Sequence, residues 1–226
     1  MAKPAINRQE KVPRQVYDIL RTRIQSAELA PGSSINERYL SDLLGVSRTP
    51  IREAIRQLSD DGLITIIPNV GTSVALVDTA RISEFCIIRT SLECAAITEA
   101  VRHFDDAADK KLDQLINEQD ATIASGDMVR NIAVDTEFHQ VIVALSGFKT
   151  IKNILKTTMG EIVRARHLSI KLPGRLREPI FEHQAILQAL RSGDPAKCST
   201  AIKDHLDKSY LSIIQAMETV APLLEK

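Results

Sequence analysis

The hydrophobic pattern of this chain changes character near Asp78. Before this residue, short apolar stripes are separated by turn residues, whereas from Thr79 onward apolar residues recur at helical spacing over long stretches. Alternation of the β type is scarce in the second region. We therefore expect a mainly α chain with two domains, residues 1–78 and residues 79–226, the second of which is an all-α helical bundle.

The first region has the order of elements of a winged helix-turn-helix. Its apolar spacing predicts a helix over residues 14–27, a second short helix ended by Gly45, and a third helix for which Ser47 is a natural N-cap. Two β-branched segments, 63–67 and 72–77, flank a turn with proline and glycine and predict a hairpin. Three helices followed by a two-stranded wing form a DNA-binding arrangement.

The start of the third helix carries residues that can read DNA. Arg48 and Arg52 lie one turn apart, so they share a face opposite the apolar stripe. An arginine fork can bond bidentately to guanine, and the hydroxyls of Ser47 and Thr49 suit phosphate oxygens. Two arginines alone would indicate an ordinary solvated surface. The ordered set of turn, caps, core stripe and hairpin favours DNA reading.

Two further residues of this region are candidates for DNA contact. Arg38, at the start of the second helix, can reach the backbone or a neighbouring base, and Gly71 at the wing would allow close approach to the minor groove. The formal net charge is +0, so contacts with DNA must come from a local arrangement of basic residues.

The run ELAPGSSINERYLSDLLGVSRTPIREAIRQLSDDGLITIIPNVGTSV resembles the DNA-binding domain of the GntR family of bacterial transcription regulators. One departure is Val70, which stands where the family often has a basic or polar residue before the wing glycine. This departure removes the side-chain contact expected there, although not one from the Gly71 backbone. The resemblance implies DNA contacts from Arg38, Arg48, Thr49, Arg52 and Gly71.

Composition is that of an ordinary globular protein, with 44% apolar and 26% charged residues. No apolar run approaches the length that spans a bilayer, and the basic residues 1–14 lack the apolar core of a signal peptide. Cys86, Cys94 and Cys198 show no CxxC spacing and are interpreted as buried or incidental thiols. We expect a cytoplasmic protein without a membrane partner.

Six helical stretches are predicted in the second region, separated by stop signals such as Gly126-Asp127. A bundle of this size can enclose a pocket. The stretches are residues 82–104, 107–125, 128–145, 150–168, 175–192 and 195–219.

Four side chains of this bundle would form a metal site if their helices meet. Asp135 and His139 lie one turn apart on one face, and His183 and His205 lie among apolar positions of the fifth and sixth stretches. One carboxylate and three imidazoles suit zinc, nickel, cobalt or manganese, with open positions for a carboxylate ligand. The competing interpretation is a set of ordinary core or surface histidines, because the sequence does not show whether separate helices converge.

Residues from about 82 to 217 resemble the FCD domain, the C-terminal effector-binding domain of the FadR subfamily of GntR regulators. The motifs that carry the resemblance are IIRTSLE, DTEFH, EHQAIL and the break GDP. Six helices fit the shorter, VanR-like form. The resemblance implies a metal site whose ligands are Asp135, His139, His183 and His205. For this donor set we expect zinc or nickel, with manganese or cobalt as alternatives.

Arginines of the bundle are candidates for binding an effector. Arg89 lies in a mainly apolar helix, and the resemblance implies that it pairs with a ligand carboxylate in the pocket. An ion pair with Glu93 is its alternative role. Arg164, and with less support Arg166, could also line the cavity. Phe148 replaces an asparagine that the family often has, which changes the expected pocket floor or helix cap.

These features predict a homodimeric transcription regulator, a repressor or an activator, that binds a pseudo-palindromic operator in double-stranded DNA. A small carboxylate bound at the metal would change its affinity for DNA. Two alternatives remain open, a purely structural metal with the effector elsewhere, and a metal-dependent hydrolase. The lack of an HExxH motif and of an obvious general base argues against an enzyme.

Overall fold

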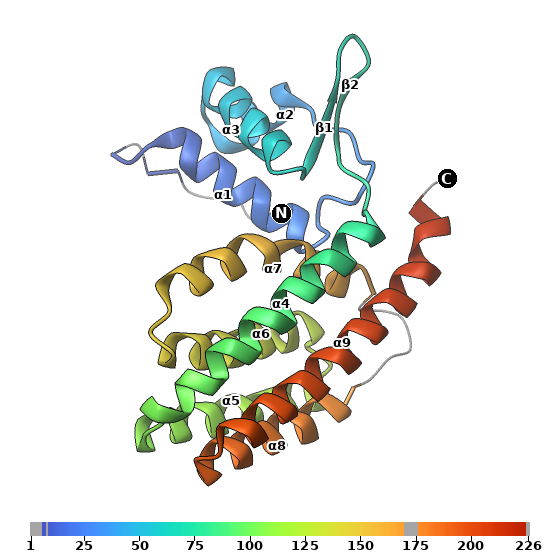
Figure 1. Ribbon diagram of the computed structural model, residues 1–226. Coiled ribbons are helices and arrows are strands. Elements are labelled where there is room, and N and C mark those ends of the chain that lie inside the picture. The colour runs from blue at the N-terminus through green and yellow to red at the C-terminus, as the bar shows by residue number, and fades with distance from the viewer. Residues whose placement is uncertain (1–5, 8, 170–175, 225–226) are drawn as a thin grey trace. The chain divides into compact units, whose positions relative to one another are not determined.

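The computed structural model describes residues 6–7, 9–169 and 176–224, and it is mainly helical (Figure 1). Contacts divide the chain into two compact units that part between Val77 and Asp78. The outer limits expected for the two domains, residues 1 and 226, and the expected start of the fifth bundle helix at residue 175 lie outside the described residues.

In its described part, the first unit contains three helices and a two-stranded antiparallel sheet (Figure 1). This order confirms the predicted winged helix-turn-helix. The strand register pairs Ile64 with Val74 and Ile67 with Gly71. The elements are α1 (Val12–Gln25), α2 (Glu37–Leu44), α3 (Arg48–Asp60), β1 (Ile64–Ile67) and β2 (Gly71–Val74).

One apolar core holds the first unit together. Leu20 of α1 and Ile51 and Leu58 of α3 are fully buried in it, and Ile64 and Val74 extend it to the hairpin. These side chains lie on the inner faces of amphipathic elements. As a result, the opposite face of α3 is turned to solvent.

Capping residues determine where α2 and α3 begin and end. Asn36 Oδ1 accepts a hydrogen bond of 3.0 Å from the Tyr39 amide at the start of α2, and Gly45 ends that helix with φ of 66°. Ser47 occupies the N-cap position of α3, as predicted, with extended backbone. Within the described residues its side chain makes no capping hydrogen bond, which differs from the usual role of an N-cap serine.

The described residues of the second unit form six α-helices and one short 3-10 helix (Figure 1), which confirms the predicted all-α bundle. The first helix begins earlier than residue 82 because the Asp78 side chain caps it by accepting from the Arg81 amide at 3.1 Å. Among the described residues, no helix has the length and apolarity that crossing a membrane requires. The elements are α4 (Thr79–Ala100), η1 (Val101–His103), α5 (Asp106–Ser125), α6 (Met128–Leu145), α7 (Lys149–Ser169), α8 (Glu178–Ser192) and α9 (Pro195–Leu224).

Helix α6 runs through the middle of this bundle and packs against α4, α5 and α7. Phe138 and Ile142 of α6 are almost fully buried and share a core with Leu112 of α5, Ile186 of α8 and Ile202 of α9. Because α6 is covered on several sides, polar side chains on its inner face lie in the interior, where they need partners.

Candidate metal centre and nucleic-acid interface

A cluster of one carboxylate and three imidazoles lies buried inside the bundle. Asp135 and His139 project from α6, His183 from α8 and His205 from α9, and each residue is at most 3% exposed. One potential ligand atom from each of the four lies within 4.8 Å of the others. The structure therefore brings together the four side chains that the sequence suggested as metal ligands.

Each imidazole is held from outside the cluster by an oxygen at its Nδ1 atom. Ionised carboxylates and amide carbonyls only accept hydrogen bonds, so each Nδ1 donates and the Nε2 lone pair is left for the cluster. Such outer partners orient metal-binding histidines. The pairs are His139 with Glu93 of α4 (2.6 Å), His183 with Gln119 of α5 (2.8 Å) and His205 with Glu182 of α8 (2.9 Å).

The Nε2 atoms face one another across the cluster. His139 Nε2 lies 3.1 Å from His205 Nε2, a gap that holds one proton at most. His183 Nε2 is buried without a hydrogen-bond partner in the described part of the chain, at 3.8 Å from Asp135 Oδ1. A divalent cation would bind the Nε2 atoms that face one another and would supply the missing partner of His183, so these residues fit a metal ion.

Burial keeps two of the imidazoles neutral. Burial, together with the nearby His205, lowers the pKa of His183 well below its usual value. Burial also lowers the pKa of His205, against the opposite effect of its hydrogen bond to Glu182. The ring of Phe138 stacks on His183 with centroids 4.1 Å apart and contributes to this apolar surrounding. Neutral imidazole is the form that binds metals.

Two arginines keep the buried carboxylates ionised. Burial acts to raise the pKa of Glu93, but Arg89 and His139 overcome it and lower this pKa to about 2. Burial likewise acts on Asp135, but the charge of Arg166 holds the pKa of this carboxyl well below its usual value. The centre thus combines anionic carboxylates with two neutral imidazoles, those of His183 and His205.

Arg89 forms one of the two contacts considered for it. Its Nε donates to Glu93 Oε1 at 2.7 Å, which is the ion pair proposed as the alternative. The residue is only 3% exposed, and its Nη2 is buried without a hydrogen-bond partner among the described residues. A buried guanidinium nitrogen in this state can donate a hydrogen bond to the carboxylate of a ligand.

Arg164 and Arg166 have different surroundings on α7. Arg164 is 1% exposed, and its Nη1 lies 3.5 Å from Glu161 Oε2 one turn earlier. Arg166, the weaker candidate by sequence, forms a short ion pair with Asp135 of the cluster. The contact between Arg166 and Asp135 was not predicted from the sequence.

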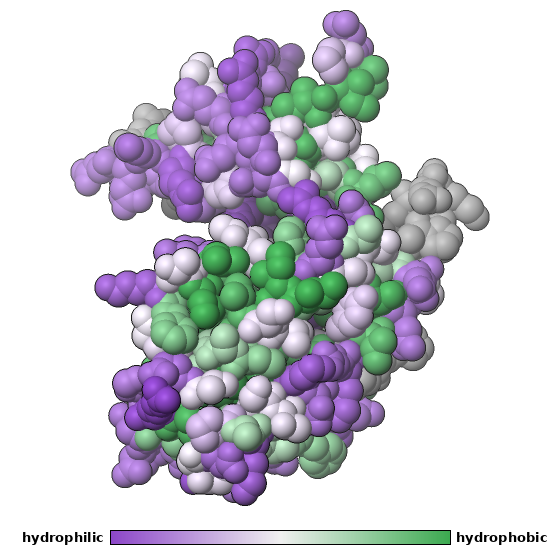
Figure 2. Space-filling model, viewed as in Figure 1, coloured by the Kyte–Doolittle hydropathy of each residue, from purple (hydrophilic) through white to green (hydrophobic). Residues whose placement is uncertain are grey.

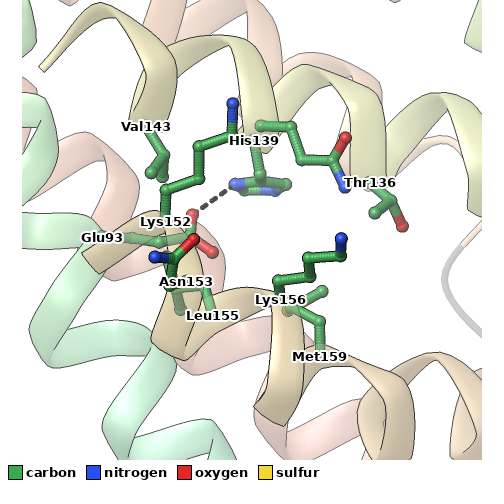
Figure 3. A pocket seen from close by; sticks show the side chains of 10 residues that line it. Glu93, Thr136, His139, Val143, Lys152, Asn153, Leu155, Lys156 and Met159 are labelled. Carbon is green, nitrogen blue, oxygen red and sulfur yellow. Dashed lines mark hydrogen bonds and ion pairs between the residues drawn. The ribbon is translucent and has the colours of Figure 1, made fainter. Parts of the chain in front are cut away.

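A pocket of about 370 Å³ opens beside the cluster, between α4, α6 and α7 (Figure 3). Glu93 and His139 form part of its wall, where the hydrogen bond between them is visible, so His139 belongs to both pocket and cluster. Lys152 and Lys156 line the side formed by α7. Their one-turn spacing in the sequence places both on one helix face. Apolar surface comes from Val143, Leu155 and Met159.

The residues suggested for DNA contact lie on the outside of the first unit. Arg52 Nε donates to Glu37 Oε2 of α2 at 2.8 Å, while 59% of the Arg52 side chain stays exposed. Sequence reasoning did not include Glu37, which holds this arginine in place across the helix-turn-helix. The exposed candidates are Arg38, Ser47, Arg48, Thr49, Arg52 and Gly71.

The wing carries apolar side chains on its surface, as Figure 2 shows. Ile66, Ile67 and Val70 are 43%, 49% and 79% exposed. Gly71 has φ of 151°, which L residues rarely adopt, and an added Cβ would meet open space. The glycine is therefore required by backbone conformation, and the wing surface around it remains accessible.

Comparison with known proteins identifies the family. Residues 13–74 match the bacterial regulatory proteins of the gntR family, and residues 84–208 match the FCD domain. The chain belongs to the GntR family. The resemblance found in the sequence is thereby confirmed for both parts of this GntR-family regulator.

Relatives of this GntR-family chain are transcriptional regulators. It is 30% identical over 194 residues to an HTH-type transcriptional regulator in an unstable DNA locus of Streptomyces ambofaciens, covering 85% of this chain and 81% of that protein. It is 27% identical over 210 residues to the HTH-type transcriptional repressor RspR of Escherichia coli K12, covering 93% and 92%. The chain is a bacterial DNA-binding transcriptional regulator.

Solved structures agree with this assignment. A putative GntR transcriptional regulator from Rhodococcus sp. RHA1 matches with a TM-score of 0.76 and 25% identity, over 90% of this chain and 98% of that one. Escherichia coli McbR/YncC matches with a TM-score of 0.79 over 91% and 98%, and at 24% identity this likeness concerns the fold.

Proposed function

We propose that this regulator binds a pseudo-palindromic operator as a homodimer, and that a small carboxylate bound beside a divalent metal changes its operator affinity. The observation that carries the proposal is the buried meeting of three imidazole Nε2 atoms and one carboxylate beside a pocket. The proposed ligands are Asp135, His139, His183 and His205.

The donor set favours zinc or nickel, with manganese or cobalt as weaker candidates. Imidazole nitrogen suits zinc and nickel, and one carboxylate completes a four-ligand set. Both metals can expand their coordination beyond four ligands, which leaves room for an oxygen of a bound carboxylate. When bound, the metal supplies a positive centre to which such an anion coordinates.

Basic groups near the cluster support a carboxylate as the effector. Arg89 keeps an unsatisfied nitrogen in the interior, and Lys152 and Lys156 line the pocket that adjoins His139. Arg164, buried on α7, remains a second candidate for effector contact. A ligand with an acidic group and a small apolar body would match this mixture of charge and apolar surface.

For DNA reading we propose base contacts from Arg48 and Arg52 and backbone contacts from the neighbouring candidates. The N-terminal end of the second helix of a helix-turn-helix reaches base edges in the major groove. Arg38, Ser47 and Thr49 would position α3 through phosphates, and the backbone at Gly71 would approach the minor groove.

A homodimer is supported by the apolar surface of α4. Ile87 and Ile88 of this helix are 64% and 37% exposed. Figure 2 shows apolar side chains gathered over the face of the helical unit that is turned to the viewer. Light scattering of the full chain should give twice the monomer mass, and a monomer at micromolar concentration would contradict the dimer.

A purely structural metal is the second candidate function, because the cluster joins α6, α8 and α9 and is almost completely enclosed. In that case the metal would raise the melting temperature without altering ligand binding. The reported relatives are transcriptional regulators, and we propose no catalytic role for the centre.

Thermal melting with and without metal separates these two roles. We expect that a panel of small carboxylates includes one that raises the melting temperature of the zinc-loaded regulator, since a ligand that binds only the native state stabilises it. The same compound should leave chelator-treated protein unchanged. An equal shift in both forms would contradict a metal-bound effector and favour a structural metal.

Removing the two pocket lysines should weaken carboxylate binding and leave the metal in place. The double variant Lys152→Ala/Lys156→Ala should lower the affinity for the carboxylate selected by the melting experiment by about fivefold or more, as expected for one or two solvent-screened charge pairs. Calorimetry measures the affinity, and mass spectrometry the metal content. Lys149→Ala, at the exposed start of α7, is the matched control. If control and double variant bind equally, the lysines are not part of the effector site.

A further inference from the structure

The two oxygens of Asp135 face different partners. Oδ2 accepts from Arg166 Nη1 in a short ion pair, while Oδ1 lies 3.8 Å from His183 Nε2 inside the cluster. Asp135 is 2% exposed, whereas the Arg166 side chain is 16% exposed and reaches the edge of the interior. One carboxylate thus joins the imidazole cluster to a basic side chain of α7.

Three carboxylates around the cluster are each paired with a basic side chain without a metal. A divalent ion would add two positive charges beside these pairs, in an interior that screens them weakly. The neighbouring guanidiniums then become unfavourable unless anions enter or one guanidinium moves away. The three balanced pairs are Glu93 with Arg89, Asp135 with Arg166, and Glu182 with Lys208 (3.4 Å).

Arg166 is the cation best placed to move. It is bonded directly to a proposed ligand, so its hydrogen bond draws electron density from the oxygens that the metal would use. Arg89, by contrast, is 3% exposed and is bonded to Glu93, which orients an imidazole from outside the cluster. The partly exposed Arg166 can leave Asp135 without leaving a buried charge unpaired.

We infer that Arg166 and the metal compete for Asp135. In the metal-free regulator Arg166 binds the Asp135 carboxylate, and metal binding releases the Arg166 guanidinium. The released guanidinium can then donate hydrogen bonds to an anion that the metal attracts. The inference rests on the metal centre proposed above and deepens it. It makes Arg166 a positioning residue whose two arrangements couple metal loading to anion binding, and such coupling is reciprocal.

Zinc titration of the metal-free full chain against a chromophoric competing chelator tests the exchange. Arg166→Gln should bind zinc about tenfold more tightly than wild type, because a charge-assisted hydrogen bond that opposes the metal is gone. Arg166→Lys keeps the positive charge but loses the two-pronged guanidinium, so its zinc affinity should lie between those of wild type and Arg166→Gln. This variant also tests the exchange if Arg166→Gln folds poorly. Arg130→Gln breaks the exposed pair between Arg130 of α6, the helix that carries Asp135, and Glu118 of α5, and this variant should bind zinc as wild type does.

Two further readouts follow the guanidinium itself. Nitrogen-15 spectra of arginine-labelled protein should show one side-chain signal, absent in Arg166→Gln, that shifts from a bonded to a solvated position when zinc is added. With acetate as the probe, zinc-loaded wild type should bind the anion more tightly than zinc-loaded Arg166→Gln. Equal acetate binding by the two proteins would overturn the inference that the released Arg166 binds the anion.

The outcomes distinguish the exchange from the proposed metal centre. Weaker or unchanged zinc binding in Arg166→Gln would overturn the exchange and would mean that Arg166 only orients Asp135 from outside. If wild type binds no zinc, or if His183→Ala binds zinc as wild type does, the metal centre itself is wrong and the exchange falls with it.

Discussion

Replacing His183 by alanine should abolish stoichiometric zinc binding by the regulator. His183 is 0% exposed, its Nδ1 is held by Gln119 and its Nε2 faces the cluster without a hydrogen-bond partner among the described residues. Loss of an outer partner of a metal ligand typically costs 10–100-fold in affinity, and loss of the ligand itself should exceed that range. Mass spectrometry of the purified chain and a competitive titration measure the effect.

Thermal melting gives an independent measure of the same substitution. Zinc should raise the melting temperature of wild type, since a ligand at about a thousand times its dissociation constant adds about 4 kcal/mol. His183→Ala should melt at the same temperature with and without zinc, whatever its own loss of packing against Phe138. His103→Ala, which removes an exposed histidine, is the matched control and should keep the zinc response. A full response in His183→Ala would exclude this cluster as the metal centre.

Arg48→Ala and Arg52→Ala should each weaken specific operator binding by about 1–3 kcal/mol and relax the base preference at one position. Both arginines are exposed on the first turns of α3, opposite the buried Ile51. Because the whole chain has a formal net charge of +0, general attraction to DNA cannot compensate for their loss. Fluorescence anisotropy with an operator selected by the purified regulator measures the change.

Arg52 is bonded to Glu37, whereas the control residue for the two DNA-binding arginines lies outside this unit. Arg102→Ala, which removes an exposed arginine of the short helix η1, makes the same change in net charge outside the DNA-binding unit and is the control. If Arg48→Ala and Arg52→Ala bind the operator as Arg102→Ala does, the assignment of α3 as the recognition helix is wrong. A lower salt dependence in one variant would identify that arginine as a phosphate contact.

Most of the fold could be predicted from local signals. Apolar spacing, Gly45 as a helix end and the β-branched segments gave the correct order of elements, because each depends on residues a few positions apart. The errors lie at boundaries. The first bundle helix begins at Thr79 because Asp78 caps it, although its apolar pattern is visible only from Ile82. Ser47 stands at the predicted N-cap, yet its hydroxyl makes no capping bond among the described residues.

The candidate site was predictable in its residue types and incomplete in its contacts. The one-turn spacing of Asp135 and His139 places them on one helix face, and that relation is local. The partners of the imidazoles come from other helices, at separations that no periodicity reports. Gln119, for example, is 64 positions from His183. Arg164 and Arg166 lie about 200° apart around one helix, so only the packing of α7 decides which of them meets Asp135.

The sequence by itself determined the helix-turn-helix with its wing, the helical bundle and the kinds of side chain available to bind DNA, a metal and an anion. These features follow from helix and strand periodicity and from capping, which act over a few residues. Only the tertiary structure decided that the four potential ligand atoms meet, that Glu93 is shared by Arg89 and His139, and that Arg166 holds Asp135. Those contacts depend on how separate helices pack, because a side chain's partners across a core are set by the shape of all the residues between them.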